Sequence, residues 1–123
     1  MTRILAVDDN RDILEVIELI LEDCGYEVET LTSGHHLFDK IREMNPDLIL
    51  LDIMLGDMDG RILCEEVKNR PETSNIPVVL ISASHNMADS IAQNRKGAPN
   101  AFIAKPFDIS DLVGTIQSNI AAA

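Results

Sequence analysis

Hydrophobic and polar residues alternate along this chain in two kinds of segment. Short apolar runs of strand length are separated by longer segments in which apolar residues recur every three or four positions, as they do on one face of a helix. The run LILLDI, residues 48–53, is apolar at every position except Asp52. Such a uniform run is typical of a strand that is buried on both faces of a parallel sheet. The pattern therefore predicts alternating strands and helices, with an aspartate near the end of a buried strand.

The pattern predicts five strands and five helices. The strands are expected at 4–8, 26–34 (running into a turn), 47–53, 76–82 and 101–105, and the helices at 10–25, 35–44, 60–70, 86–97 and 108–123. Strands that alternate with helices pair in parallel, and the crossovers place helices on both faces of the sheet. We therefore expect an α/β fold with a doubly wound, five-stranded parallel sheet. The length suits one domain, 1–123, without a linker or an output domain.

The apolar spacing also predicts which side of a helix faces the core. Residues expected to face inward are Ile13, Ile17, Leu21 and Cys24 in the first helix, Leu37, Ile41 and Met44 in the second, and Leu112, Val113, Ile116 and Ile120 in the last. Asp108 or Ser110 suits the cap of the last helix. Cys24 and Cys64 have no neighbouring His or Cys ligands, so we expect reduced, packed thiols and not a metal site.

Composition narrows the classes of partner. Hydrophobic residues make up 46% and charged residues 25% of the chain, which is typical of a soluble globular protein. No apolar run approaches the roughly 20 residues of a membrane span, and the N-terminus does not resemble a signal peptide, so we expect a cytoplasmic protein without membrane insertion. The 21 acidic residues exceed the 10 basic ones, giving a net charge of −11. This charge opposes binding to nucleic acid, where Lys and Arg supply most of the affinity.

Polar residues end most of the predicted strands. The first strand ends in Asp8 and Asp9, the third in Asp52, the fourth in Ser82 and the fifth in Lys105. Each alone has an ordinary interpretation, as a helix cap, an exposed strand end, a loop hydroxyl or a solvated lysine. In parallel sheets of this kind, however, ligands bind outside the C-terminal ends of the strands. Three carboxylates gathered there would repel one another, and Mg²⁺ would offset that repulsion. A lysine and a hydroxyl beside them suggest phosphoryl chemistry.

Four segments carry a resemblance to a known family. VDDN, LLDIMLGDMDG, LISAS and AKPF, in this order and at strand ends, resemble the signature segments of the response-regulator receiver domains of two-component signalling. The resemblance spans nearly the whole chain and is greatest to single-domain regulators of the chemotaxis type. It implies the flavodoxin-like strand order 2-1-3-4-5.

The resemblance implies a role for each acidic residue. Asp52 would be the phosphoacceptor and would become an acyl phosphate. Asp9 and Asp52, with the backbone carbonyl of Met54, would ligate Mg²⁺, and Asp8 would contribute largely through water. Lys105 would pair with the phosphoryl oxygens.

Further residues would transmit and tune the signal. By the same resemblance, Ser82 would move to bond the phosphoryl group and Phe102 would turn inward with it. Met54 and Ser84 would tune the rate of dephosphorylation, and Pro106 would follow a cis peptide bond. Gly56 and Asp57 stand where many relatives have Pro-Gly, and the loop containing Pro99 is one residue longer than usual.

The resemblance also implies partners. The phosphodonor would be a sensor histidine kinase or a histidine phosphotransfer protein of a phosphorelay. The output surface would comprise the predicted helix 86–97, strand 101–105 and helix 108–123, and would contact a separate protein target. The chain would be no enzyme beyond its own phosphorylation and autodephosphorylation.

Three other functions compete with this interpretation. A degenerate receiver could act as a docking module, although all five site residues are present. A phosphatase resembling the haloacid-dehalogenase family would need a second acid two residues after Asp52, where this chain has Met54. A flavin-binding carrier would need a hydroxyl-rich phosphate loop and aromatic residues, which make up only 3% of the chain.

Overall fold

The central sheet has five parallel strands in the order β2-β1-β3-β6-β7. The computed structural model describes residues 2–56, 58–82 and 97–120. The sheet strands are β1 (Arg3–Val7), β2 (Glu27–Leu31), β3 (Leu48–Asp52), β6 (Val78–Ser82) and β7 (Ala101–Ala104). Counted along the sheet alone, this is the expected order 2-1-3-4-5, so the predicted doubly wound parallel sheet is confirmed.

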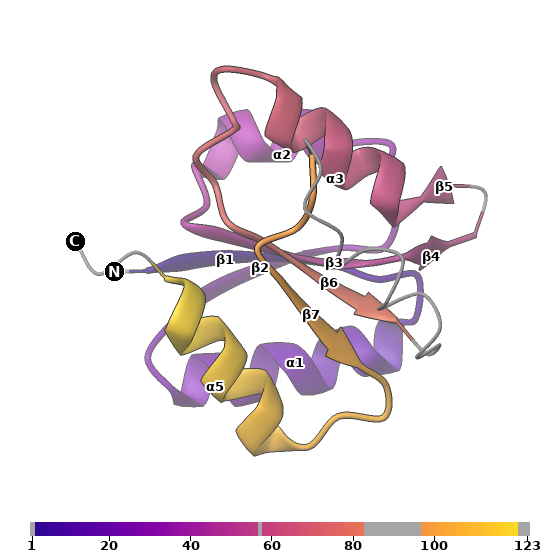
Figure 1. The fold of residues 1–123 in the computed structure, drawn as a ribbon. Coiled ribbons are helices and arrows are strands. Elements are labelled where there is room, and N and C mark those ends of the chain that lie inside the picture. Colours follow the sequence, from indigo (N-terminus) through magenta and orange to yellow (C-terminus); the bar gives the residue numbers. More distant parts are fainter. Residues whose placement is uncertain (1, 57, 83–96, 121–123) are drawn as a thin grey trace.

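Helices cover both faces of the sheet (Figure 1). The described helices are α1 (Arg11–Asp23), α2 (Leu37–Met44), α3 (Gly60–Asn69) and α5 (Ile109–Asn119). Helices α2 and α3 lie on one face, and α1 and α5 lie on the other (Figure 1). Except for Gly97, the predicted helix 86–97 lies outside the described residues.

The core is divided by the sheet into two layers. Along β3, Ile49 and Leu51 pack with the residues of α2 and α3, whereas Leu48 and Leu50 pack with those of α1 and α5. All five residues of β3 are buried. This two-sided burial explains why the strand is apolar throughout and does not alternate.

The predicted helix faces are mostly confirmed. Leu37, Ile41 and Met44 are buried in α2, Ile17 and Leu21 in α1, and Leu112 and Ile116 in α5; Ile13, Val113 and Ile120 are half-buried. Asp108 caps α5, because its side chain accepts from the Asp111 amide. The prediction for Cys24 was wrong: it follows the last turn of α1 as the C-cap and is exposed, whereas Cys64 is buried.

A short hairpin after β3 was not predicted. Strands β4 (Met54–Leu55) and β5 (Met58–Asp59) pair antiparallel. Gly56 lies in the turn with φ 69°, a conformation that glycine adopts with little strain, and Asp57 lies outside the described residues. The hairpin leads from β3 directly into α3, so it fixes the position of the chain beside Asp52.

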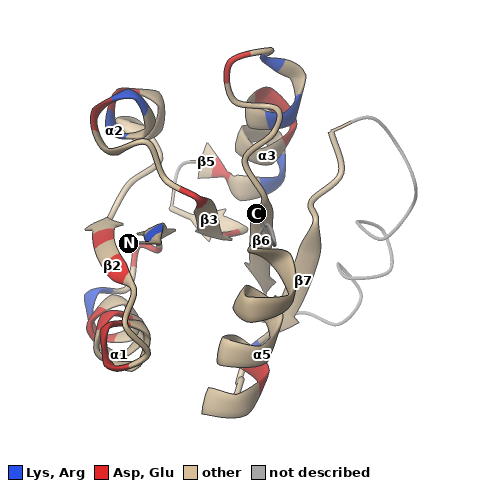
Figure 2. Cartoon of the chain, turned by 90° about the vertical axis from the view of Figure 1, so that its left-hand side faces the viewer, with Lys and Arg blue, Asp and Glu red and all other residues tan. Residues whose placement is uncertain are grey.

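Most described acidic residues are exposed, and they are most frequent along α1 (Figure 2). Asp8 and Asp52 are the exceptions, because they are the only acidic residues that are buried in the described part of the chain. No described helix has both the length and the apolar composition that crossing a membrane requires.

Candidate functional site

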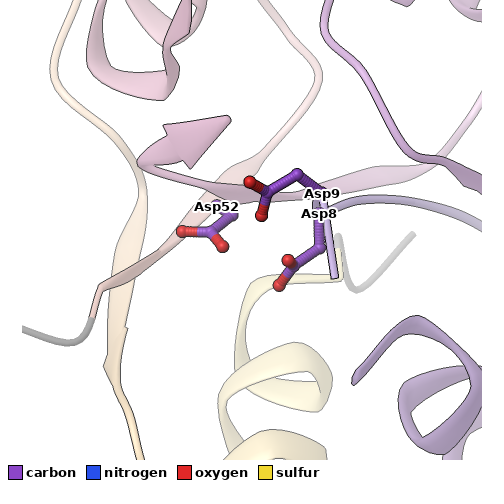
Figure 3. Close-up of side chains that lie close together, drawn as sticks. All are labelled: Asp8, Asp9 and Asp52. Carbon is purple, nitrogen blue, oxygen red and sulfur yellow. The ribbon is translucent and has the colours of Figure 1, made fainter. Parts of the chain in front are cut away.

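Three aspartates gather where the central strands end (Figure 3). Asp8 directly follows β1, and Asp52 ends β3, which pairs with β1 in parallel register. Asp9 comes next in the chain and is exposed. One carboxylate oxygen of each residue lies within 4.8 Å of the others. The structure therefore brings together the three acidic residues that the sequence placed at one sheet edge.

Lys105 joins the two buried aspartates. Its Nζ lies 2.9 Å from Asp52 Oδ2 and 3.0 Å from Asp8 Oδ2. Its backbone amide donates to the carbonyl of Ser82 at 2.7 Å, which anchors the end of β7 to the neighbouring strand β6. One ammonium thus partly neutralises two buried carboxylates. The peptide bond between Lys105 and Pro106 is cis, as the resemblance implied.

Backbone amides orient the two buried carboxylates. Asp52 Oδ1 accepts from the Met54 amide at 3.0 Å, so each carboxylate oxygen of Asp52 has a different partner. Asp8 Oδ1 accepts from the Asn10 amide at 2.9 Å, and the Asn10 side chain also caps α1. Sequence reasoning missed Asn10. The signal was the spacing of Asp8 and Asn10, because an aspartate often accepts from the amide two residues on.

Burial and charge shift the ionisation of this group. Burial raises the pKa of the Asp8 carboxyl, and this outweighs the hydrogen bonds from Asn10 and Lys105, which lower it. Burial lowers the pKa of the Lys105 ammonium, but the hydrogen bonds to Asp52 and Asp8 prevail and raise it. The ammonium therefore stays charged at neutral pH, while a charged Asp8 is costly.

Replacing Asp8 by Asn is expected to stabilise the metal-free protein at neutral pH. The pKa of Asp8 is higher in the folded protein than in the unfolded chain, so protonated Asp8 favours folding. This contribution to stability is complete below the ordinary pKa of 3.8 and is lost as the pH rises through the folded-state pKa. The uncharged amide avoids this loss, and substitutions that relieve such a site commonly add about 0.5–2 kcal/mol to the free energy of unfolding. Urea denaturation in EDTA should show the largest gain at neutral pH and the smallest in acid. A variant less stable than wild type at neutral pH would contradict this expectation.

The other predicted site residues occupy different surroundings. Ser82 ends β6 and is buried, with 2% of its surface exposed. Phe102 lies on β7, is half-buried, and packs against the apolar layer beneath α2 and α3. Met54 begins β4 next to Asp52 and is 67% exposed. Ser84 lies outside the described residues.

The donor set fits Mg²⁺. All three side chains offer carboxylate oxygens, the ligands that this hard cation prefers. Mg²⁺ binds oxygen at about 2.0–2.1 Å, so its ligands lie roughly 3–4 Å apart and only a small contraction of the group is needed. The charge also fits, because Lys105 offsets only part of the negative charge of Asp8, Asp9 and Asp52. The site can therefore accept a small divalent cation at the sheet edge.

Comparisons with known proteins agree with the fold and with this edge. Residues 4–117 match the family model of the response regulator receiver domain. The receiver domain of NtrX from Brucella abortus is 33% identical, with a TM-score of 0.85, over 98% of this chain and 99% of that chain. A CheY-like response regulator receiver domain protein from Methanospirillum hungatei JF-1 is 30% identical, with a TM-score of 0.86, over 98% and 94% of the two chains.

A receiver domain that belongs to a histidine kinase is also similar. The signal receiver domain of a signal transduction histidine kinase from Syntrophus aciditrophicus is 28% identical, with a TM-score of 0.86, over 98% of this chain and 90% of that chain. Receiver domains are signalling modules that bind Mg²⁺ at an acidic pocket and interact with histidine kinases and effectors. The family model covers almost the entire sequence, and the sheet order and acidic edge agree with it. The chain therefore belongs to the response-regulator receiver domains of two-component signalling.

Proposed function

We propose that this receiver domain is a phosphorylation-dependent switch with Asp52 as its phosphoacceptor. The observation that carries the proposal is the environment of Asp52. The residue is 5% exposed, its Oδ2 accepts a hydrogen bond from Lys105 Nζ at 2.9 Å, and it lies next to Asp8 and Asp9. A carboxylate in this setting is held rigidly beside compensating groups, as an activated nucleophile requires. Asp9 is exposed, so the site remains open to a phosphodonor.

The chemistry follows from these positions. An oxygen of Asp52 bonds to the phosphorus of the donor, and the bond between that phosphorus and the donor histidine breaks, with the imidazole leaving with the electron pair. Asp9, Asp52 and the Met54 carbonyl would hold Mg²⁺, with Asp8 acting largely through water, and the cation would supply positive charge to the phosphoryl oxygens. Lys105 already lies against Asp52 Oδ2, so its ammonium can pair with an oxygen of the incoming group.

Phosphorylation would bias a pre-existing equilibrium through Ser82 and Phe102. Ser82 ends the strand beside Asp52, since residues Asp52 and Ile81 are paired across β3 and β6. Phe102 is only half-buried on the edge strand, which supports a side chain able to change its packing. Met54 and Ser84 would tune dephosphorylation, and the exposure of Met54 supports contact with an approaching water or partner.

The partners would be a histidine kinase or phosphotransfer protein and a downstream protein target. The output surface would include β7 and α5 together with the predicted helix 86–97, of which only Gly97 is described. The alternative of a docking module without phosphotransfer is less well supported, because it gives no reason to bury Asp8 and Asp52 around one lysine. An aspartyl phosphatase is disfavoured because the exposed Met54 occupies the position of its second acid.

Incubation with a small-molecule phosphodonor tests this proposal. We expect acetyl phosphate to add one phosphoryl group per chain in the presence of Mg²⁺ and none in EDTA, because the uncompensated carboxylates repel the donor. Intact-mass spectrometry measures the adduct, which should be stable in acid and labile in base. Absence of an adduct with every donor, together with no thermal stabilisation by Mg²⁺, would favour the docking module. Continued hydrolysis of many phosphate esters would favour the phosphatase.

A further inference from the structure

The first residue of α3 approaches the backbone of Asp52 more closely than a side chain would allow. A Cβ atom built on Gly60 would lie 2.1 Å from the carbonyl oxygen of Asp52 and 2.9 Å from both its carbonyl carbon and the Cα of Ile53. Real Cβ atoms essentially never come within 3.0 Å of heavy atoms outside their own and the adjoining residues. The obstructing atoms are backbone atoms of the sheet edge, which cannot move aside as the end of a flexible side chain can. Only glycine fits at this position.

Glycine is needed here for space and not for an unusual backbone conformation. The described glycines with positive φ are Gly25, Gly56 and Gly97, and Gly60 is not among them. Its φ is therefore one that any residue could adopt. The features that exclude a side chain are the Asp52 carbonyl and the adjoining Cα of Ile53.

The same contact fixes the peptide that carries the proposed phosphoacceptor. The Gly60 amide donates to the Ile53 carbonyl at 2.7 Å, while the Ile53 amide donates to the Ile81 carbonyl at 2.9 Å. The Asp52–Ile53 peptide is thus held by β6 through its amide, and the following Ile53–Met54 peptide is held by the start of α3 through its carbonyl. The next amide, that of Met54, is the one that bonds Asp52 Oδ1. A shift of these two peptides would therefore displace both the Asp52 carboxylate and the Met54 backbone.

The start of α3 is itself firmly held. Asp59 caps the helix by accepting from the Arg61 amide at 2.9 Å. The Arg61 guanidinium bonds both carboxylate oxygens of Asp59, with its Nη2 2.7 Å from Oδ2. The helix is anchored to the sheet by the Gly60 bond to the Ile53 carbonyl and by the core residues Leu63, Cys64 and Val67. A side chain at position 60 would therefore transmit its clash to the Asp52 peptide.

We propose that Gly60 is a positioning residue for the acidic site. By leaving room for the Asp52 carbonyl, it lets the start of α3 hold the Asp52 carboxylate and the Met54 carbonyl in the orientation that the cation and the phosphoryl group require. The inference rests on the proposed function. It assigns to Gly60 a role in ligand geometry that differs from a contribution to stability alone.

The chain offers two matched control positions. A Cβ on Gly34 would also clash, at 2.5 Å from Leu63 Cδ1 and 3.1 Å from Met58 Sδ, but these are side-chain atoms that do not belong to the site. A Cβ on Gly114 in α5 would meet no heavy atom within 4 Å. Gly34→Ala therefore reports the effect of strained packing near α3, and Gly114→Ala reports the effect of an added methyl group by itself.

The experiment is an NMR titration of ¹⁵N-labelled wild type and of the three alanine variants with Mg²⁺. The readout is the Mg²⁺ dissociation constant, and urea denaturation in EDTA gives the stability of each variant. We expect Gly60→Ala to weaken Mg²⁺ binding by about 10–100-fold, the range seen when groups that orient metal ligands are altered. Gly34→Ala should lose stability but keep the wild-type affinity, and Gly114→Ala should keep the affinity with stability equal to or above that of wild type, because alanine favours the helix. Phosphorylation by acetyl phosphate should slow in Gly60→Ala alone.

Each outcome decides the inference. Wild-type affinity in Gly60→Ala, or an equal loss in Gly34→Ala, would overturn it while leaving the proposed function intact. A wild type that neither binds Mg²⁺ nor takes up phosphate would overturn both. If Gly60→Ala does not fold, the wild-type spectrum decides: the Gly60 amide signal should move with Mg²⁺ saturation while that of Gly114 stays in place, and an unmoved Gly60 signal would overturn the inference.

Discussion

Asp52→Asn is expected to abolish phosphorylation by acetyl phosphate without unfolding the protein. The amide has the shape of the carboxylate but lacks the charged oxygen that would bond to phosphorus. Its oxygen can still accept one of the two hydrogen bonds that Asp52 receives, from Met54 or from Lys105. Intact-mass spectrometry in the presence of Mg²⁺ should find the adduct in wild type and none in the variant.

The fold of Asp52→Asn should be preserved because the substitution relieves charge repulsion. In wild type, Lys105 faces two buried carboxylates; in the variant it faces Asp8 alone. We therefore expect the free energy of unfolding in EDTA to stay at or above that of wild type. Such a result would show that the loss of the adduct is chemical and does not come from unfolding.

Asp47→Asn is the matched control. Asp47 directly precedes the other end of β3, is exposed, and accepts from the Arg3 amide at 2.8 Å. The substitution makes the same change of charge at the opposite end of the same strand, so phosphorylation should be unaffected. An adduct of equal yield in Asp52→Asn would show that another residue accepts the phosphoryl group.

The sequence was sufficient to predict the sheet and the acidic edge, because both depend on local patterns. The uniform run 48–51 could be satisfied only by a strand with helices on both sides, and Asp52 at its end then had to meet the residues that end the neighbouring strand. The face of α2 was equally clear, since Leu37, Ile41 and Met44 repeat at helical spacing and all three are buried.

The features that sequence reasoning missed depend on contacts between distant atoms or on how an element ends. Cys24 fits the apolar spacing of α1, but the helix ends at Asp23, so the thiol turns to solvent. The β4–β5 hairpin has only two residues in each strand, too few to show a period. The requirement for glycine at position 60 comes from a carbonyl eight residues earlier in the chain, which no local pattern reveals.

Stability and function make opposite demands on this edge. The apolar layers on either side of β3 account for the burial of Asp8 and Asp52, and burial makes their charges costly. The protein retains those charges because the proposed chemistry needs them, a compromise that is common at functional sites. Lys105 is the group that makes the compromise tolerable, so its removal is the most severe test of the site.

Lys105→Met is expected to lower the free energy of unfolding by about 3–5 kcal/mol at neutral pH in EDTA, because it leaves two buried carboxylates without their shared cation. This is a large part of the roughly 5–15 kcal/mol that stabilises a typical domain. Methionine fills a similar volume, so the loss should come from charge and not from a cavity. Urea denaturation followed by circular dichroism measures the change. We also expect the reaction with acetyl phosphate to be slower by at least about 100-fold, since the ammonium can no longer pair with the phosphoryl oxygens.

Lys40→Met is the control for the loss of one positive charge. Lys40 also contacts two acidic residues, at 2.6 Å from Glu29 Oε1 and 3.9 Å from Glu43 Oε1, but Glu43 is exposed and Glu29 only half-buried. Exposed ion pairs contribute little to stability, so this variant should unfold close to wild type and be phosphorylated at the wild-type rate. A similar loss of stability in both variants would show that net charge, and not the buried site, is responsible.

The pH dependence separates the charge of Lys105 from its packing. The pKa of Lys105 is higher in the folded protein than in the unfolded chain, so its positive charge favours folding. This contribution is complete below the ordinary pKa of 10.5 and is lost only as the pH rises through the folded-state pKa. The difference between wild type and Lys105→Met should therefore be constant through neutral pH and shrink in strong alkali. It should also shrink in acid, where the Asp8 carboxyl, whose pKa burial raises, becomes protonated and no longer needs a cation.

Combining the two substitutions tests this account directly. Lys105→Met loses stability because two buried carboxylates are left without a cation. Adding Asp8→Asn removes one of these charges and should recover part of the lost stability. This gain should be larger than the gain that Asp8→Asn gives in the wild-type protein. The excess is the coupling between the two residues, which their separation of 3.0 Å requires to be substantial. Additive effects would mean that Lys105 supports the sheet edge through packing alone. Recovery of stability beyond the gain in the wild-type protein would show that Lys105 stabilises the fold by neutralising the buried carboxylates.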